Sequence, residues 1–246
     1  AAALVALGLA GVGWWLAAKR GAPSGSTKSP PRITSLAVKP LDDYSGDTNL
    51  AYLSDGMTAA LCTALGNISA LRVPGRASVM RYKGLQKSIR EMAQELKVDA
   101  IVEGAVQRSG NRISVRVGLV EATKDRQLWG TNYNRDLSDF FVVQEEVARA
   151  IAAEVQVRLT PEDQARLERA RPAKPEAIEA YLRGGMQQWW QWSDEGTTNA
   201  RRYFEKAIEI DPGYAPAHAG LALAYVLGAS WIRVWSPDEG GPNKGK

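Results

Sequence analysis

The sequence predicts an α+β fold: a mixed β-sheet with packed helices, preceded by a transmembrane helix and followed by an α-helical repeat region. Three observations predict this arrangement. Residues 1–18 carry no charge and are almost all apolar. Residues 112–119 alternate between polar and apolar, which is typical of a strand with one buried face. Small residues, an aromatic residue and a proline recur over residues 200–212 at the spacing of a repeated helix pair.

The composition indicates a globular protein of one or two domains. The chain has 246 residues, of which 45% are hydrophobic and 24% are charged, so it can bury a packed core. The net charge of +4 is mild, and most basic residues have acidic residues nearby in the sequence. Nucleic-acid binding needs a patch of one sign and a recognisable module, and the sequence has neither, so we expect no nucleic-acid partner.

The N-terminal residues predict a membrane anchor. Residues 1–20 are interpreted as a transmembrane helix truncated at its start, because 18 helical residues span about 27 Å, close to the roughly 30 Å of a bilayer core. Trp14 and Trp15 lie where an aromatic belt would fall, and residues 1–18 are expected to contact the membrane. A cleaved signal peptide is the alternative, but it needs a preceding basic segment. Residues 21–33 predict a Pro/Gly/Ser linker.

Residues 34–160 predict a small α/β domain, and its first half alternates strands and helices. Residues 35–41 are short and apolar, as in a strand. A second strand is expected over residues 71–76, ended by a Pro-Gly pair. Ser88 and Glu91 have the spacing of a capping box at the start of a helix. Apolar residues at three- and four-residue steps predict a helix between the two strands: Leu50, Leu53, Met57, Leu61, Ala64, Leu65 and Ile68.

The second half of this domain predicts an antiparallel meander. Its strands are expected over residues 100–108, 112–119 and 126–133, and a Ser-Gly-Asn turn joins the first two. Arg112 and Arg116 fall on the polar side of the middle strand, so we interpret them as a solvated strand face.

Two helix starts follow the meander. Ser138 is expected to cap a long helix with apolar residues at four-residue spacing, namely Val147, Ile151, Val155 and Leu159. Thr160, Pro161 and Asp163 supply a cap, a first-turn proline and a first-turn acid for a further helix. Residues 161–175 are therefore interpreted as a helix and a linker.

The order and spacing of these segments also resemble a known family. The chain is similar to the TolB amino-terminal-like domain, which is related to the FlgO domain, over nearly all of residues 34–160. The resemblance implies a fragment of a bacterial membrane-anchored signalling protein of the kinase, cyclase or CadC-like regulator type. No catalytic residue is carried over from the family. The segments that carry the resemblance are residues 35–61, 71–84, 95–137 and 143–160.

The resemblance also implies a location. In such proteins the domain lies between a membrane helix and tetratricopeptide repeats, which implies a single pass of the inner membrane and a periplasmic soluble part. Lys19 and Arg20 alone would favour a cytoplasmic flank, but the positive-inside rule compares both flanks and only one is visible.

Residues 176–246 are interpreted as tetratricopeptide repeats, one complete and one partial. Gly184 or Gly185 takes the small position of the first helix, and residues 189–199 are expected to widen the turn between the helices. The second-helix pattern is matched by Ala200, Phe204, Ala207 and Pro212, and the first helix of the next repeat by Leu221, Ala222 and Tyr225.

The repeat region also carries the candidate partner-binding residues. Trp189, Trp190, Trp192 and Tyr181 could form an aromatic surface for a protein partner in the repeat groove. The alternative is that at least one of the tryptophans packs in the core of the repeat, because aromatic side chains mostly pack.

The sequence gives no sign of catalytic machinery. The single histidine, His218, falls where a repeat helix needs a bulky residue, and no motif places an acid or base beside it. Cys62 lies on an apolar helix face, as expected of a buried thiol. Asp42 and Asp43 are adjacent, so they would point to opposite faces of a strand, and a turn is expected there. We therefore expect no enzyme activity, catalytic residue, cofactor or metal site within this chain.

These observations favour a non-catalytic sensor or protein–protein interaction region of a membrane-anchored bacterial signalling or regulatory protein. Two alternatives stay open. One is a structural component of the cell envelope of the FlgO type, and the other is a hydrolase built on the TolB-like domain.

Overall fold

The computed structural model describes residues 33–47, 50–167, 172–190 and 193–235. The predicted membrane segment, residues 1–18, lies outside these ranges, as does most of the predicted linker. No helix within the described ranges is long and apolar enough to cross a membrane.

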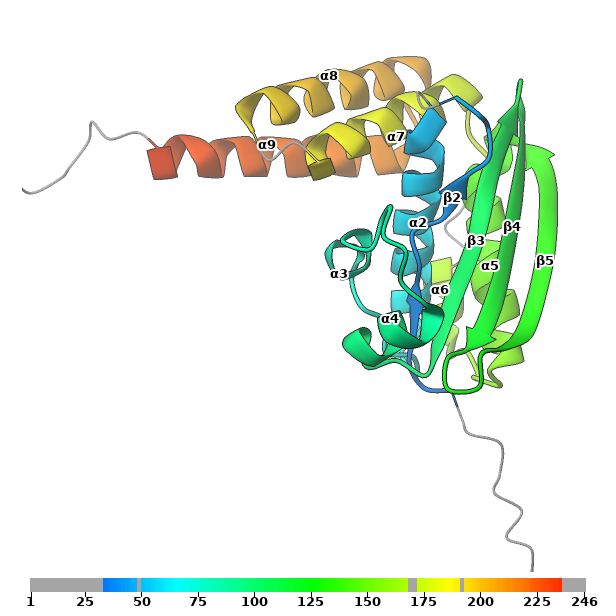
Figure 1. Ribbon diagram of the computed structural model, residues 1–246. Coiled ribbons are helices and arrows are strands. Elements are labelled where there is room, and N and C mark those ends of the chain that lie inside the picture. Colours follow the sequence, from blue (N-terminus) through cyan, green and yellow to red (C-terminus); the bar gives the residue numbers. More distant parts are fainter. Residues whose placement is uncertain (1–32, 48–49, 168–171, 191–192, 236–246) are drawn as a thin grey trace, which may run out of the picture. The chain divides into compact units, whose positions relative to one another are not determined.

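A mixed β-sheet organises the fold, as the sequence predicts (Figure 1). Its strands are β1 (Leu36–Val38), β2 (Asp42–Asp43), β3 (Ala100–Ser109), β4 (Arg112–Glu121) and β5 (Arg126–Asp136). The order is β1-β3-β4-β5, and β2 pairs with β3 beyond the end of β1. Both β1 and β2 run parallel to β3, whereas β3, β4 and β5 form the predicted antiparallel meander.

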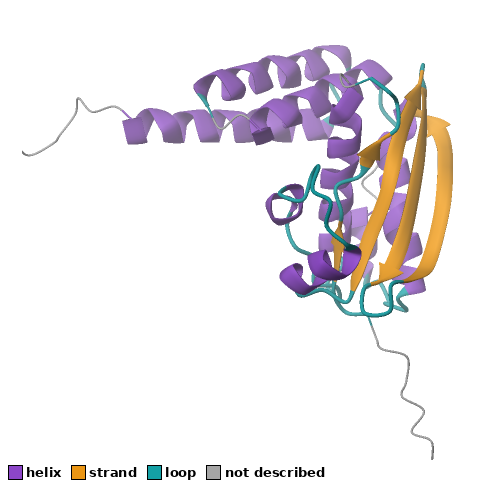
Figure 2. Ribbon diagram, viewed as in Figure 1, coloured by secondary structure: helices purple, strands orange, loops and turns teal. Residues whose placement is uncertain are grey.

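Two long helices pack together on one face of the sheet. They are α2 (Ala51–Gly66) and α5 (Phe140–Glu154), and Figure 2 shows helices on one side of β3, β4 and β5 only. The alternation in β4 directs its apolar residues into this layer, where Ile113 and Leu119 are fully buried. The polar residues of β4 therefore lie on the opposite face, which the long helices leave uncovered.

Two short helices complete the domain, α3 (Arg76–Met80) and α4 (Ile89–Leu96). The capping box at the start of α4 is confirmed: the Ser88 side chain accepts from the Glu91 backbone N–H at 3.2 Å, and the Glu91 carboxylate accepts from the Ser88 N–H at 2.9 Å.

Three local expectations are wrong. The predicted strand at residues 71–76 is reduced to one isolated bridge between Ser35 and Arg72, because a proline follows closely and α3 begins at Arg76. Ser138 does not cap α5; it lies in a 3-10 turn, Leu137–Asp139, and the helix starts after it. Asp42 and Asp43 form β2 rather than a turn.

Helices dominate the C-terminal part. These are α6 (Pro161–Leu167), α7 (Pro175–Trp190), α8 (Asp194–Ile210) and α9 (Ala215–Trp235). Helix α8 packs against both α7 and α9. The expected widening of the turn before α8 is wrong, because most of residues 189–199 extends the two helices. Ser193 caps α8 by accepting from the backbone N–H of Gly196 at 3.0 Å.

A glycine-lined notch fits α8 between its neighbours. Phe204 of α8 is fully buried, and its ring lies directly against Gly184 of α7 and Gly220 of α9. A methyl group at either glycine would fall 2.8 Å from Phe204 Cε1. The helices can approach this closely only because both positions lack a side chain.

The helical part shares its core with the sheet domain. One buried cluster runs from Ile33 to Ala217, across the linker predicted at residues 161–175. In this cluster Leu182 of α7 packs against Gly56 of α2.

Polar contacts reinforce this junction. Arg108, at the end of β3, donates from Nη1 to the Tyr52 hydroxyl at 2.8 Å and to Glu179 Oε2 at 3.0 Å. Arg183 donates to Glu179 Oε1 at 3.0 Å, and its guanidinium lies 4.4 Å from the centroid of the Tyr52 ring. These four side chains join α2, β3 and α7.

Asp163 holds the start of α6 against the loop after α2. Its carboxylate accepts from the backbone N–H of Thr160 at 3.0 Å, and from the N–H and hydroxyl of Ser69, both at 3.1 Å. These hydrogen bonds hold the pKa of Asp163 below its usual value, and the one from the Thr160 backbone has the largest effect.

Candidate functional site

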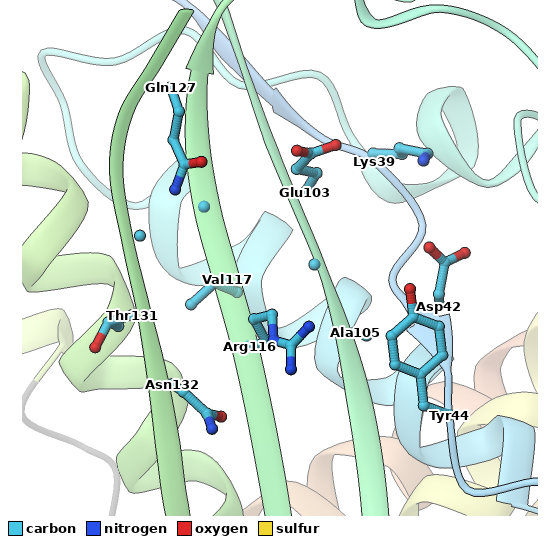
Figure 3. A pocket seen from close by; sticks show the side chains of 13 residues that line it. Lys39, Asp42, Tyr44, Glu103, Ala105, Arg116, Val117, Gln127, Thr131 and Asn132 are labelled. Carbon is cyan, nitrogen blue, oxygen red and sulfur yellow. The ribbon is translucent and has the colours of Figure 1, made fainter.

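The candidate site is a polar trough of about 520 Å³ on the face of the sheet that the long helices leave uncovered. Figure 3 shows the side chains that line it, which come from β3, β4, β5 and residues 39–44, in and around β2. Sites of this volume can hold a small ligand or a few residues of a partner.

The strand register explains why the trough is hollow. Glu103 on β3 lies opposite Gly118 on β4, which in turn lies opposite Gly130 on β5. Of the three residues in this row, only Glu103 has a side chain. In the next row, Arg116 of β4 lies between Ala105 and Asn132. The two glycines form a bare floor beside the Arg116 side chain.

Charged groups of both signs converge on this floor. Arg116 lies in the middle of the trough, between Asn132 and Tyr44, while Glu103 and Lys39 lie towards one end (Figure 3). The side chains of Lys39, Glu103 and Arg116 form no hydrogen bond or ion pair with any residue that the structure describes. A guanidinium, an ammonium and a carboxylate are thus free to bind groups of opposite charge.

Two amide side chains form the β5 wall of the trough. The Asn132 carbonyl oxygen accepts from the Ser114 hydroxyl at 3.0 Å, which leaves the Asn132 amide N–H groups able to donate. Gln127 donates to the backbone carbonyl of Trp129 at 3.4 Å and lies beside Gly130. The arrangement can therefore recognise polar and charged groups through several side chains at once.

Of the residues discussed as possible catalysts, Asp42 lines the trough, whereas His218 and Cys62 lie elsewhere. His218 is exposed on α9, with Nε2 2.8 Å from the carbonyl oxygen of Pro212. Cys62 is buried in α2, and burial raises the pKa of its thiol to about 12. Within the described ranges, no group of three or more His, Cys, Asp or Glu side chains is arranged to hold a metal ion.

Tyr181, the predicted partner-contact residue that the structure describes most fully, lies in an aromatic cluster rather than in the trough. Its ring centroid is 5.6 Å from Tyr214, 5.7 Å from Phe204 and 5.9 Å from Phe141. Burial raises the pKa of Tyr181. The side chain is only partly buried, so its role as a partner contact stays a prediction.

The tryptophan predictions stay open as well. Trp189 and Trp190 end helix α7, and Trp192 lies outside the described residues.

The sequence pointed to only part of the trough. Alternation in β4 correctly placed Arg112 and Arg116 on the polar face. Glu103 and Asn132 were missed, because their position beside Arg116 depends on the register between strands. The available signal was Gly118 and Gly130, two glycines inside strand patterns, which often mark a close approach or an open surface.

Comparison with known proteins gives one clear sequence relative. No protein-family model matches the chain. The chain is 37% identical over 217 residues to "Putative adenylate cyclase 3" of Rhizobium meliloti (strain 1021). This alignment covers 87% of the chain and 36% of the relative, so the chain spans about a third of that protein's length.

Solved structures give more distant similarities. Lipoprotein GNA1162 from Neisseria meningitidis has a TM-score of 0.38 at 18% identity, covering 49% of this chain and 99% of that one. TolB from Acinetobacter baumannii has a TM-score of 0.38 at 16% identity, covering 52% and 30%. The LpoB C-terminal domain from Salmonella enterica has a TM-score of 0.33 at 15% identity, covering 44% and 87%. The chain is thus similar in sequence to one region of a larger protein named as a putative adenylate cyclase, and its structural neighbours include TolB and a lipoprotein.

Proposed function

We propose that this chain is a non-catalytic sensor or protein-interaction region of a membrane-anchored bacterial signalling protein. The observation that carries the proposal is the mixed-charge trough on the uncovered sheet face, in which Lys39, Glu103 and Arg116 lack partners among the described residues. Charged side chains that converge without pairing are suited to recognising another molecule.

The sequence relative supports the signalling part of the proposal. The relative is named as a putative adenylate cyclase, and the chain matches only 36% of its length. We therefore place the output activity, a cyclase or another signalling enzyme, in a part of the whole protein outside this chain. The apolar residues 1–18 would anchor the protein in the inner membrane, with the trough on the periplasmic side.

The helical part would supply a second contact surface. Leu223, Tyr225 and Val226 are exposed on α9 although they are large and apolar. Further helical repeats or a protein partner would cover them, and Trp189, Trp190, Trp192 and Tyr181 remain the proposed partner contacts of the repeat groove.

Site-specific photo-crosslinking in cells that produce the whole protein tests the trough. A photoreactive residue at Asn132, on the β5 wall, should give an adduct of discrete mass with a periplasmic protein or peptide. The same residue at Glu162, exposed on α6, is the control and should give no such adduct. Arg116→Glu should abolish the Asn132 adduct while leaving the melting temperature unchanged, because Arg116 is exposed.

Two results would contradict the proposal. One is the absence of an adduct at Asn132 in cells that produce the whole protein. The other is an equal yield of the same adduct at Asn132 and Glu162, which would indicate collisional labelling.

A further inference from the structure

Strand β5 is an open edge of the sheet. It ends the strand order and pairs with β4 only, and Figure 1 shows no described element beyond it. In an antiparallel pair, every second residue directs its backbone N–H and C=O away from the neighbouring strand. β5 therefore presents a row of backbone groups to the outside. The opposite edge is protected: β1 has three residues, and the adjoining Ser35 is bridged to Arg72.

β5 lacks most of the features that usually protect an edge strand, because its charged residues, Arg126, Arg135 and Asp136, lie at its two ends. It is 11 residues long and contains neither lysine nor proline. Its register irregularity lies opposite Leu119 and Val120, near its start, so the pairing from Trp129 to Asp136 is regular. A regular edge of this length is a template for pairing with another strand.

The side chains of β5 that face the helices are only half covered. Trp129 and Tyr133 pack against the core but stay partly exposed, as does Thr131 between them. The residues that alternate with them, Gly130 and Asn132, are exposed on the trough face. A strand added at this edge would cover the remaining aromatic surface and satisfy the outward backbone groups.

We propose that the added strand is β5 of a second copy of this chain, paired antiparallel about a two-fold axis through Thr131. Side chains of paired residues must share a face, so a two-fold axis perpendicular to the sheet has to pass through a residue. An axis at Thr131 places Trp129 opposite Tyr133 of the second copy and Gly130 opposite its Asn132. Each of these pairs occurs twice, and the large and small side chains are matched.

The trough supports this choice of partner. Gly130 and Asn132 line the trough and also belong to the β5 edge. Pairing about Thr131 therefore brings the two troughs together across the seam, and two separate hollows become one groove running over both copies. A strand from an unrelated protein would give no such continuity.

Disulfide trapping in the full chain tests both the pairing and its register. Cys62 is the single cysteine and is buried, so Cys62→Ala gives a cysteine-free background. In that background Thr131→Cys places the new thiol on the axis, next to its own symmetry mate. Mild oxidation should then produce a covalent dimer of twice the 26.7 kDa chain mass.

Asn134→Cys is the matched control. With the axis at Thr131, Asn134 of one copy and Asn134 of the second copy are offset by six residues along the strand, roughly 20 Å. A disulfide needs the two Cα atoms to lie within about 7 Å of each other. The Asn134→Cys variant should therefore stay monomeric on a denaturing gel. The wild-type chain should sediment with twice the mass of one chain as its concentration rises.

The outcomes separate the possibilities. A covalent dimer from Thr131→Cys alone, together with a sedimenting wild-type dimer, supports the pairing. A wild-type chain that stays monomeric throughout the concentration series overturns it. Trapping at Asn134 instead of Thr131 overturns the register, and a mixed adduct with a different protein at Thr131 overturns the second copy as the occupant.

Discussion

Replacing Gly184 by alanine tests the notch that holds α7, α8 and α9 together. The new methyl carbon would lie 2.8 Å from Phe204 Cε1, 2.9 Å from Phe204 Cδ1 and 3.1 Å from Tyr203 Cβ. The Phe204 ring cannot move away freely, because its Cε1 atom also lies 2.8 Å from the methyl position at Gly220. Either the Phe204 ring or helix α7 must therefore shift.

The expected magnitude combines two opposing terms. Overpacking a buried site costs about 1–3 kcal/mol. Replacing glycine by alanine inside a helix stabilises it by about 1 kcal/mol. The Gly184→Ala variant should therefore lose between about 0 and 2 kcal/mol of unfolding free energy relative to the wild type.

Gly228→Ala separates these two terms. Gly228 is also inside a helix, but among the described residues its methyl position comes close only to Thr197 Cγ2, at an ordinary 3.6 Å. This variant should gain about 0.5–1 kcal/mol. The Gly184→Ala variant should then be less stable than Gly228→Ala by about 1–3 kcal/mol, which isolates the overpacking term.

Urea unfolding followed by far-ultraviolet circular dichroism gives both free energies, provided that the slope with urea stays constant. Adding Phe204→Leu to Gly184→Ala should cost less than Phe204→Leu costs in the wild type, because the smaller side chain relieves the clash. The reasoning fails if the Gly184→Ala and Gly228→Ala variants agree to within about 0.3 kcal/mol.

Three further predictions follow from single contacts. Asp163→Asn should cost about 2 kcal/mol at neutral pH, since charge-assisted hydrogen bonds contribute about 1.5–3 kcal/mol. The pKa of Asp163 is lower in the folded chain than its unfolded value near 3.8, so its stabilisation is complete above that value. The stabilisation disappears as the pH falls through the folded pKa, so the unfolding free energies of the wild type and the Asp163→Asn variant should converge in acid. A double-mutant cycle on Arg108 and Glu179, both partly exposed, should give a coupling of about 0.5–1 kcal/mol that weakens with salt; an unchanged coupling in high salt would count against an ion pair. Cys62 should react with a thiol reagent only at the rate of unfolding, so rapid labelling of the folded chain would refute its burial.

Local rules predicted the features that depend on neighbouring residues. The capping box at Ser88 and Glu91 and the alternation through β4 each need only a few consecutive side chains, and both are confirmed. Ser138 shows the limit of such rules. A serine before an apolar run predicts a cap, but a 3-10 turn moves the start of α5 beyond it, and the hydroxyl lies 3.5 Å from Asp139 instead.

The trough could not be predicted, because it depends on contacts between strands. Gly118 lies opposite Gly130 only through the register between β4 and β5, which shifts at Leu119 and Val120. No single strand carries a signal for that shift. Lys39 joins the trough through the parallel pairing of β1 and β2 with β3, a contact between residues about sixty positions apart in the chain.

The junction around Arg108 limits how this protein can be recombined with its relatives. Glu179 and Leu182 belong to α7 by sequence, yet their contacts are with Arg108 of β3 and Gly56 of α2. A chimaera that exchanged the C-terminal helices at the start of α7 would import a foreign surface against α2 and leave Arg108 without its carboxylate. An exchange made after Arg183, within α7, keeps these contacts, but the graft must still supply Tyr214, whose ring centroid lies 6.3 Å from that of Phe141 in α5.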